Sequence, residues 1–285
     1  MHRVQRFIIF ALLAFILFLT ACSSGGTVGA PPPGDGRELK VHFIDVGQAD
    51  SILIQTPAGK AILIDGGNND DGIKVVNYIK SQGVKELAAV VATHPHEDHI
   101  GGLDSVIKEI PVAAVYMPNA VTTTRTFEDF INAVKASGAA RIRARGGVKM
   151  DIPGLSVEFL APNSNSYDEL NNYSAVLKIA YGNTAFLFTG DAETVSEEEM
   201  LSAGYNLKAD VLKVGHHGSA SSTSAAFLKA VAPKYAVISV GKGNDYGHPD
   251  PRVLERLQRA GVKIYRTDEH GTVIIVSDGR NITIK

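Results

Sequence analysis

The chain has 285 residues, 45% of them hydrophobic, which is enough to bury the core of one large domain or two small ones. The formal net charge of −2 excludes a generally basic protein that coats nucleic acid, but it neither supports nor excludes a phosphate-bearing substrate. Cys22 is the single cysteine, so no disulfide bond can form within the chain.

The first 21 residues have the composition of a signal peptide. Residues 1–6 carry two arginines and no acid, and residues 7–19 form an apolar run that is too short for a typical membrane span. The sequence Leu-Thr-Ala-Cys at positions 19–22 resembles the lipobox of bacterial lipoproteins. That resemblance implies cleavage before Cys22 and a lipid anchor on it, and the alternative is an uncleaved N-terminal anchor. Both interpretations place the folded part in the bacterial cell envelope, outside the cytoplasmic membrane.

Residues 22–37 are rich in Gly, Ser and Pro and indicate a tether, so we expect the folded domain to span residues 38–285. In its first half we predict strands at 41–46, 51–56, 61–65, 87–92, 112–117, 140–144 and 155–160, and helices at 71–82, 100–109 and 126–136. In its second half we predict strands at 174–181, 184–189, 210–214, 235–240, 262–266, 272–277 and 281–284, and helices at 193–203, 223–230 and 251–260. Two β-rich halves that each carry helices predict an α/β fold, an αββα sandwich of two mixed sheets with helices outside.

A dense group of metal-binding residue types follows the predicted strand 87–92, in the sequence Thr-His-Pro-His-Glu-Asp-His-Ile-Gly-Gly at positions 93–102. Imidazole nitrogens and carboxylate oxygens suit zinc, with manganese or iron as further options. The loop is too short to send all four groups to one ion in good geometry. We therefore expect two adjacent ions, one bound by His94 and His96 and the other by Asp98 and His99.

This His-x-His-x-Asp-His pattern resembles the signature of the metallo-β-lactamase superfamily, whose members bind one or two metals between two βα halves. Residues 43–50, Phe-Ile-Asp-Val-Gly-Gln-Ala-Asp, resemble the opening strand and turn of ComEC-type competence-protein domains of that superfamily. The likeness extends over roughly residues 38–285. We expect Asp45, Gln48 and Asp50 to hold turns near the site, and Asp65 to support a ligating histidine.

Three later segments supply further candidates. Strand 184–189 is followed by Asp191, which the resemblance makes the bridge between two metals and which could otherwise cap the next helix. His216 and His217 follow strand 210–214, and resemblance to related phosphoesterases favours His217 as the ligand and His216 as the substrate-facing partner, an order that the sequence leaves open. His248 lies in a Tyr-Gly-His-Pro element and is expected to donate a proton to a leaving oxygen or to bind a phosphate oxygen, with helix capping as its alternative.

One feature departs from the superfamily's usual pattern, because no histidine lies between His99 and His216. Most members supply another histidine to the first metal from this interval. The sequence Asn-Asn-Tyr-Ser at positions 171–174 stands there instead, as it does in ComEC-type domains. Water, substrate or an asparagine oxygen would then complete the first site, and its ion should bind more weakly.

A centre of two metals lowers the pKa of a bound water to about 7 and clamps the oxygens of an in-line displacement. The resemblance therefore implies a phosphodiesterase or nuclease that acts through a metal-bound hydroxide, with DNA as the favoured substrate and surface phosphodiesters second. The expected cofactors are two divalent ions, zinc first and manganese second. A phosphorylcholine-type esterase and a non-catalytic lipoprotein that binds DNA or another anion are the alternatives. The expected catalytic residues are Asp98, His216 and His248, and the expected metal ligands are His94, His96, Asp98, His99, Asp191 and His217.

Overall fold

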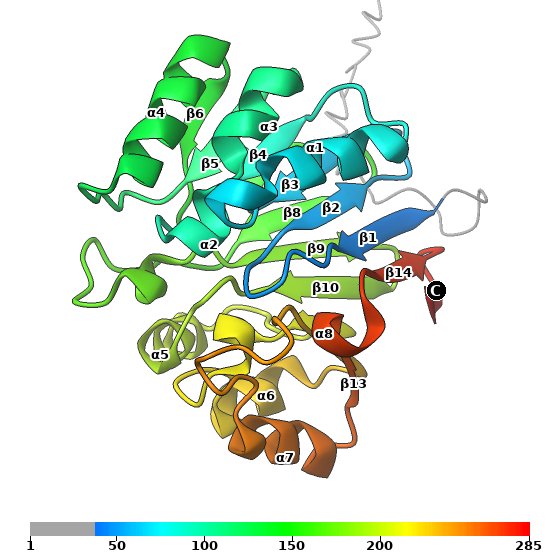
Figure 1. The fold of residues 1–285 in the computed structure, drawn as a ribbon. Coiled ribbons are helices and arrows are strands. Elements are labelled where there is room, and N and C mark those ends of the chain that lie inside the picture. Colours follow the sequence, from blue (N-terminus) through cyan, green and yellow to red (C-terminus); the bar gives the residue numbers. More distant parts are fainter. Residues whose placement is uncertain (1–37) are drawn as a thin grey trace, which may run out of the picture.

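The computed structural model describes residues 38–285, which Figure 1 shows as a ribbon coloured along the chain. The predicted signal peptide at 1–21, the lipobox cysteine Cys22 and the tether at 22–37 lie outside the described residues. In residues 38–285, no helix combines the length and the apolar character that crossing a bilayer requires.

Two β-sheets form the centre of the fold. The first contains, in spatial order, β15 (Ile282–Ile284), β14 (Val273–Ser277), β1 (Leu39–Phe43), β2 (Ile52–Gln55), β3 (Ala61–Ile64), β4 (Ala89–Val91), β5 (Ala114–Met117) and β6 (Ala140–Arg143). The second contains β13 (Lys263–Arg266), β12 (Tyr235–Ile238), β11 (Val211–Lys213), β10 (Thr184–Phe188), β9 (Leu177–Tyr181), β8 (Ser156–Phe159) and β7 (Lys149–Met150). Each sheet has an antiparallel part and a parallel part, so both are mixed.

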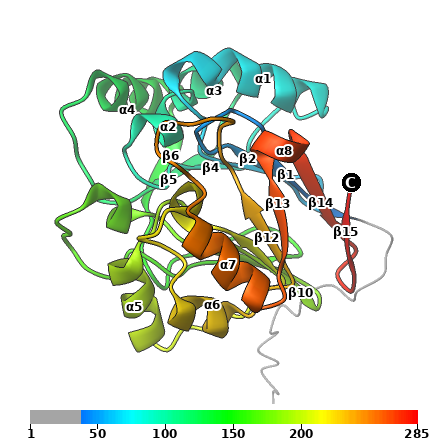
Figure 2. The ribbon, with the colours of Figure 1, turned by 60° about the horizontal axis from the view of Figure 1, so that its bottom comes forward.

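Helices cover the outer face of each sheet (Figure 1, Figure 2). The first sheet carries α1 (Gly72–Ser81), α3 (Leu103–Glu109) and α4 (Arg125–Ser137), and the second carries α5 (Thr194–Ser202), α6 (Ala225–Val231) and α7 (Pro251–Arg259). Two short helices, α2 (Glu97–Ile100) and α8 (Thr267–His270), lie at the edges of the layers. The predicted αββα sandwich is confirmed.

Alternation along the strands builds this layering. In β3, Ile62 and Ile64 face the second sheet, whereas Leu63 faces the helices on the other side. Successive side chains of a strand point to opposite faces, so a strand between two covered faces is apolar throughout. The space between the sheets is filled by the aromatic side chains of Phe43 and Phe186 with aliphatic neighbours, all buried.

The parallel strands set the position of the loops that carry chemistry. Strand β4 pairs in parallel with β3 and β5, and β11 pairs in parallel with β10 and β12. Parallel strands deliver the loops after their carboxyl ends to one edge of a sheet. His94 follows β4, Asp191 follows β10 and the pair His216 and His217 follows β11.

Several predicted elements differ in detail from the observed ones. The predicted helix 100–109 is observed as α3, which begins at Leu103, and the short helix α2, which the sequence did not predict, precedes it before Gly101 and Gly102. A Cβ atom on Gly102 would lie 2.2 Å from the carbonyl oxygen of Gly66, so only glycine fits where these two segments come into close contact. The predicted strand 174–181 begins only at Leu177, after a 3₁₀ turn at Leu170–Tyr173. The sequence analysis did not find the short elements β7 and α8.

Candidate metal centre

The histidine loop presents its side chains in two pairs. His94 Nε2 lies 2.9 Å from His96 Nδ1, just after β4. Asp98 Oδ2 lies 3.5 Å from His99 Nε2, within α2. The two pairs lie side by side, with the ring centroids of His94 and His99 4.1 Å apart, so the loop offers two adjacent groups of ligands.

Asp191 lies between these two pairs. Its Oδ2 is 3.2 Å from His99 Nε2 and 3.9 Å from His94 Nε2. The preceding residue, Gly190, has a φ of +51°, and a Cβ there would lie 2.9 Å from Thr93 Cβ, so only glycine fits this approach. The alternative role of Asp191 as a helix cap does not hold, because Glu193 is the N-cap residue of α5.

His217 joins the second pair from the other sheet. Its Nε2 lies 3.0 Å from Asp98 Oδ2 and 3.7 Å from Asp191 Oδ2. Ligand atoms of Asp98, His99, Asp191 and His217 all lie within 4.8 Å of one another. Four nitrogen and oxygen donors at such separations form a set that suits a divalent transition metal.

Each of these imidazoles is fixed through its other ring nitrogen. His99 Nδ1 lies 2.7 Å from Asp65 Oδ2, so Asp65 has the supporting contact expected of it. His217 Nδ1 donates to the carbonyl oxygen of Ser239 over 2.9 Å. A carboxylate or carbonyl on one ring nitrogen fixes the tautomer and directs the other nitrogen to a metal.

The buried carboxylate and imidazoles of the centre shift one another's pKa values. Burial alone would raise the pKa of Asp191, but the imidazoles of His99 and His217 outweigh burial and hold that pKa well below its usual range. Burial, reinforced by the neighbouring His99, lowers the pKa of His94, so His94 is a neutral imidazole of the kind that binds metals.

A buried carboxylate oxygen of Asp191 is available to bind a metal. Asp191 Oδ1 is buried and has no hydrogen-bond partner among residues 38–285. A buried carboxylate oxygen is costly unless it is hydrogen-bonded, paired with a charge or bound to a metal. The donor set of the centre therefore matches the divalent metals that the sequence predicts.

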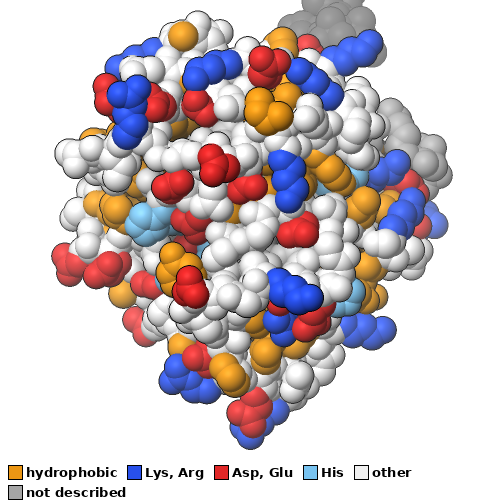
Figure 3. Space-filling model, viewed as in Figure 1, with side chains coloured by type: hydrophobic (Ala, Val, Ile, Leu, Met, Phe, Trp, Pro, Cys, Tyr) orange, Lys and Arg blue, Asp and Glu red, His pale blue; other side chains and the backbone are white. Residues whose placement is uncertain are grey.

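His216 and His248 lie at the mouth of this centre. Both line a cavity of about 530 Å³ together with His96, Asp98 and His217. The His216 side chain keeps 25% of its surface exposed, and its Nδ1 lies 3.1 Å from Glu193 Oε1. On the left of Figure 3, histidine side chains reach the surface beside acidic ones, where the two halves of the fold meet.

The order of the two adjacent histidines follows from the turn that holds them. His216 and His217 have φ values of +48° and +51°, a left-handed turn in which the two rings point in different directions. His217 is buried and its Nε2 lies 3.0 Å from Asp98 Oδ2, whereas His216 is partly exposed and does not belong to the group of four convergent ligands. This placement favours His217 as the ligand and His216 as the residue that faces the substrate.

The pair offers a direct test by metal analysis. Replacing His217 with alanine should lower the bound metal by about one ion per chain, because it removes one of four convergent donors. His216→Ala should retain the metal content of the wild type and lose rate. Inductively coupled plasma mass spectrometry on both purified variants measures the difference, and the reverse result would exchange the two roles.

The segment that replaces the usual additional histidine has two asparagines with different environments. Asn172 Oδ1 accepts hydrogen bonds from the backbone N–H groups of Glu193 and Ser196, so it supports the start of α5. Asn171 Oδ1 is buried without a hydrogen-bond partner among the described residues, while its amide nitrogen lies 3.4 Å from His216 Nδ1. Of the two asparagine oxygens, only that of Asn171 is free to complete a first metal site.

Asp50 and Lys213 form a contact that the sequence analysis missed. Lys213 Nζ lies 2.7 Å from Asp50 Oδ2, with both side chains at most 1% exposed, and Asp50 Oδ1 lies 3.6 Å from His217 Nδ1. We expected Asp50 to hold a turn, and instead it joins the two halves of the fold beside a ligating residue. A lysine within an otherwise apolar strand was the available signal.

The predicted helix-capping alternative for His248 is wrong. Asp250 is the N-cap of α7, since its side chain accepts from the backbone N–H of Arg252. Asp45 holds a local turn as expected, whereas Gln48 bonds a distant loop in the second half of the chain. Gln48 Oε1 accepts from Gly241 N, and Asp45 Oδ1 accepts from Gly47 N.

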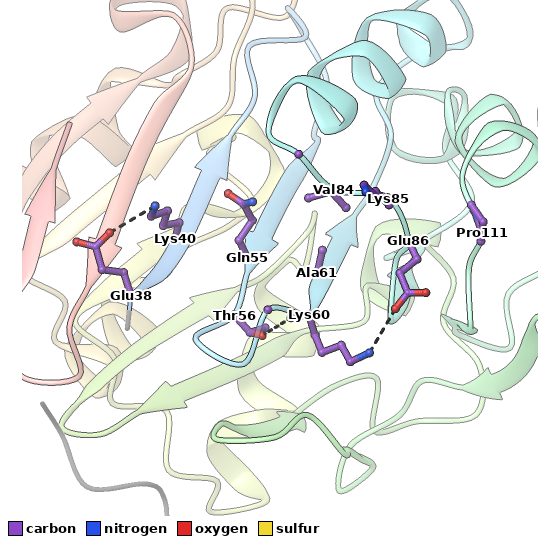
Figure 4. A pocket seen from close by; sticks show the side chains of 12 residues that line it. Glu38, Lys40, Gln55, Thr56, Lys60, Ala61, Val84, Lys85, Glu86 and Pro111 are labelled. Carbon is purple, nitrogen blue, oxygen red and sulfur yellow. Dashed lines mark hydrogen bonds and ion pairs between the residues drawn. The ribbon is translucent and has the colours of Figure 1, made fainter. Parts of the chain in front are cut away.

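A second cavity, of about 600 Å³, lies away from the metal centre at the amino ends of β3 and β4 (Figure 4). Four of its five charged side chains form exposed ion pairs, Lys40 with Glu38 and Lys60 with Glu86, and the fifth is that of Lys85. Because the two paired lysines are exposed and already neutralised, the cavity offers no comparable site for an ion.

Comparison with known proteins agrees with this geometry. The family model described as the metallo-beta-lactamase superfamily matches residues 44–242. ComE operon protein 3 of Bacillus subtilis is 33% identical over 276 residues, which cover 91% of this chain and 34% of that protein. Competence protein ComA of Neisseria gonorrhoeae is 34% identical over 239 residues, which cover 83% of this chain and 32% of that protein. The chain thus spans about a third of the length of these relatives.

Solved structures show the same fold. The metallo-beta-lactamase fold protein YhfI from Bacillus subtilis superposes with a TM-score of 0.53 at 14% identity, over 80% of this chain and 95% of that one. The family match covers more than half of the chain and contains the segments of His94, Asp191 and His217. The chain therefore belongs to the metallo-beta-lactamase superfamily and is a relative of competence proteins.

Proposed function

We propose that this protein is a metal-dependent phosphodiesterase with nucleic acid as its preferred substrate. The observation that carries the proposal is the convergence of Asp98, His99, Asp191 and His217, of which all but the buried His99 line a cavity. The pair His94 and His96 extends that group on the other side of Asp191, which supports two divalent ions, zinc first and manganese second.

Two divalent ions held there would supply an acidic water and positive charge for the oxygens of a phosphodiester. The chain's own residues hold and orient the reacting groups. Asp191 spaces the two groups of ligands, and Asp65 and the Ser239 carbonyl fix the rings of His99 and His217. His216 and His248 line the cavity above them and are placed to contact the phosphate or the leaving group.

Two alternatives keep the same site. The exposed mouth of the cavity also suits a phosphorylcholine-type ester, and a protein that binds DNA or another anion without turnover would retain the metal ligands. Relationship to proteins named for competence favours DNA over both. A lipid anchor on Cys22 would place the reaction at the envelope surface, outside the cytoplasmic membrane.

The test is hydrolysis of bis(4-nitrophenyl) phosphate by protein loaded with zinc or manganese, with chelator-treated protein as the control. The same preparations are then assayed on single- and double-stranded DNA and on 4-nitrophenyl phosphorylcholine. Metal-dependent release of nitrophenol and cleavage of DNA are the expected results. Full metal content without turnover of any phosphodiester would favour the binding protein.

His248 provides a more specific prediction. Burial, together with His216 and His217, lowers the pKa of His248, so the ring is neutral at pH 7 and offers an N–H donor rather than a readily transferred proton. We expect His248→Ala to lose about 10- to 100-fold in kcat/KM, because a hydrogen bond to a charged group contributes about 1.5–3 kcal/mol.

The loss should be equal on substrates with good and poor leaving groups if His248 only binds a phosphate oxygen. Steady-state kinetics on aryl and alkyl phosphodiesters measure it. A loss confined to the poor leaving groups would instead identify His248 as the proton donor.

A further inference from the structure

One aromatic side chain at the mouth of the cavity has no role in the reaction described so far. Tyr246 lines the same cavity as His216 and His217, and 72% of its surface is exposed. Among residues 38–285, it is the only Phe, Tyr or Trp that lines that cavity. A single exposed tyrosine needs no explanation by itself, but the backbone and the ring of this one are both held in place.

The loop that carries Tyr246 is fixed at several points. The side chain of Asn244 accepts from the backbone N–H groups of Tyr246 and His248 and donates to the carbonyl oxygen of His248. Gln48, from the first half of the chain, accepts from Gly241 N at the start of the loop. The backbone under Tyr246 is therefore ordered before any substrate arrives, which lowers the entropic cost of using the ring for binding.

The ring of Tyr246 also lies flat against its neighbour. The centroids of Tyr246 and His248 are 5.8 Å apart with an interplanar angle of 23°, and His248 in turn meets the edge of His216 at 5.5 Å. A row of rings thus leads from the exposed tyrosine to a residue beside Asp191. The rings of Tyr246 and His248 are nearly parallel, whereas that of His216 stands at 74° to His248, so Tyr246 offers one ring face and is not a wall of a box of several Phe, Tyr or Trp rings.

We infer that Tyr246 is a stacking platform for a nucleobase next to the scissile phosphodiester, an inference that rests on the proposed function. Stacking on an aromatic face is available to every base and tolerates sequence, which suits a phosphodiesterase that acts on nucleic acid. Within the described residues no Lys or Arg lines this cavity, so no lysine or arginine contact with the phosphate supplies affinity for the nucleotide there. A flat single face suits a planar base better than a quaternary ammonium group, which is usually enclosed by several rings.

The experiment compares Tyr246→Ala with Tyr246→Phe, which keeps the ring and serves as the matched control. The substrates are the 4-nitrophenyl esters of thymidine 5′- and 3′-phosphate and methyl 4-nitrophenyl phosphate, which share one leaving group and differ in the nucleoside. We expect Tyr246→Ala to raise KM about 5- to 100-fold on at least one thymidine ester. Its KM on the methyl ester should stay within about twofold of the wild type, and Tyr246→Phe should match the wild type on all three substrates.

Calorimetric binding of thymidine 5′- and 3′-monophosphate, compared with methyl phosphate, gives a readout that is independent of turnover. The wild type and Tyr246→Phe should bind one thymidine nucleotide more tightly than methyl phosphate, and Tyr246→Ala should lose that preference. If the wild type hydrolyses no phosphodiester, the proposed reaction fails, but the binding result still shows whether Tyr246 stacks on a nucleobase.

Three outcomes would overturn the inference. Equal losses on the nucleoside and methyl esters in Tyr246→Ala would mean that the ring only supports its loop. No loss on any ester and no change in binding would make Tyr246 an ordinary surface residue. A loss confined to 4-nitrophenyl phosphorylcholine would assign the ring to a quaternary ammonium group.

Discussion

Asp191→Ala is expected to remove most of the bound metal and to lower phosphodiester hydrolysis by more than about 100-fold. Replacing a residue that only supports a metal ligand already costs about 10- to 100-fold in metal affinity or activity, and Asp191 is expected to be a ligand itself. The reason is the position of its carboxylate. Asp191 Oδ2 lies within 3.9 Å of ring nitrogens from both groups of ligands, His94 on one side and His99 and His217 on the other. Its loss therefore affects both ions, whereas His94→Ala affects only one.

Metal content per chain, measured on purified Asp191→Ala and His94→Ala, tests the bridging position. Asp45→Ala is the matched control, since Asp45 is a nearby carboxylate that contacts a turn and not the ligand group. It should retain the metal of the wild type. A full metal complement in Asp191→Ala would contradict the assignment, and circular dichroism shows whether the variant is folded.

Lys213→Met is expected to lower the free energy of unfolding by about 3–5 kcal/mol, because it leaves the Asp50 carboxylate buried and unpaired. Lys213 belongs to β11 of the second sheet, and Asp50 belongs to the loop that precedes β2 of the first. Their contact of 2.7 Å lies where both side chains are at most 1% exposed, so no water replaces the lost partner. The substitution itself keeps the length of the side chain and removes its charge.

A matched control comes from an exposed pair of similar geometry. Lys108 Nζ lies 2.6 Å from Asp104 Oδ2, but the Lys108 side chain is 61% exposed, so Lys108→Met should cost less than about 1 kcal/mol. The double variant Asp50→Asn, Lys213→Met should recover part of the lost stability. Urea unfolding of the wild type, the two single variants and the double variant measures these differences. Equal losses of unfolding free energy at Lys213 and Lys108 would show that the buried pair contributes no more than the exposed one.

The sequence by itself determined the layers of the fold and the local groups of ligands. Alternation and covered faces follow from residues close in sequence, as in β3, where Ile62 and Leu63 face opposite sides. The histidine loop is similarly local, since six consecutive positions contain both pairs. Residue type and spacing were enough there, because chain connectivity already limits the distances between these side chains.

The tertiary structure decided what depends on contacts between distant segments. The sequence left His216 and His217 exchangeable, and a left-handed turn between two packed sheets buries one ring and exposes the other. Between α2 and α3, Gly102 lies so close to the carbonyl of Gly66 in another loop that no side chain fits there. The pairing of Asp50 with Lys213 likewise joins residues far apart in the chain. Such contacts depend on the relative position of two sheets, and no local propensity or spacing specifies that position.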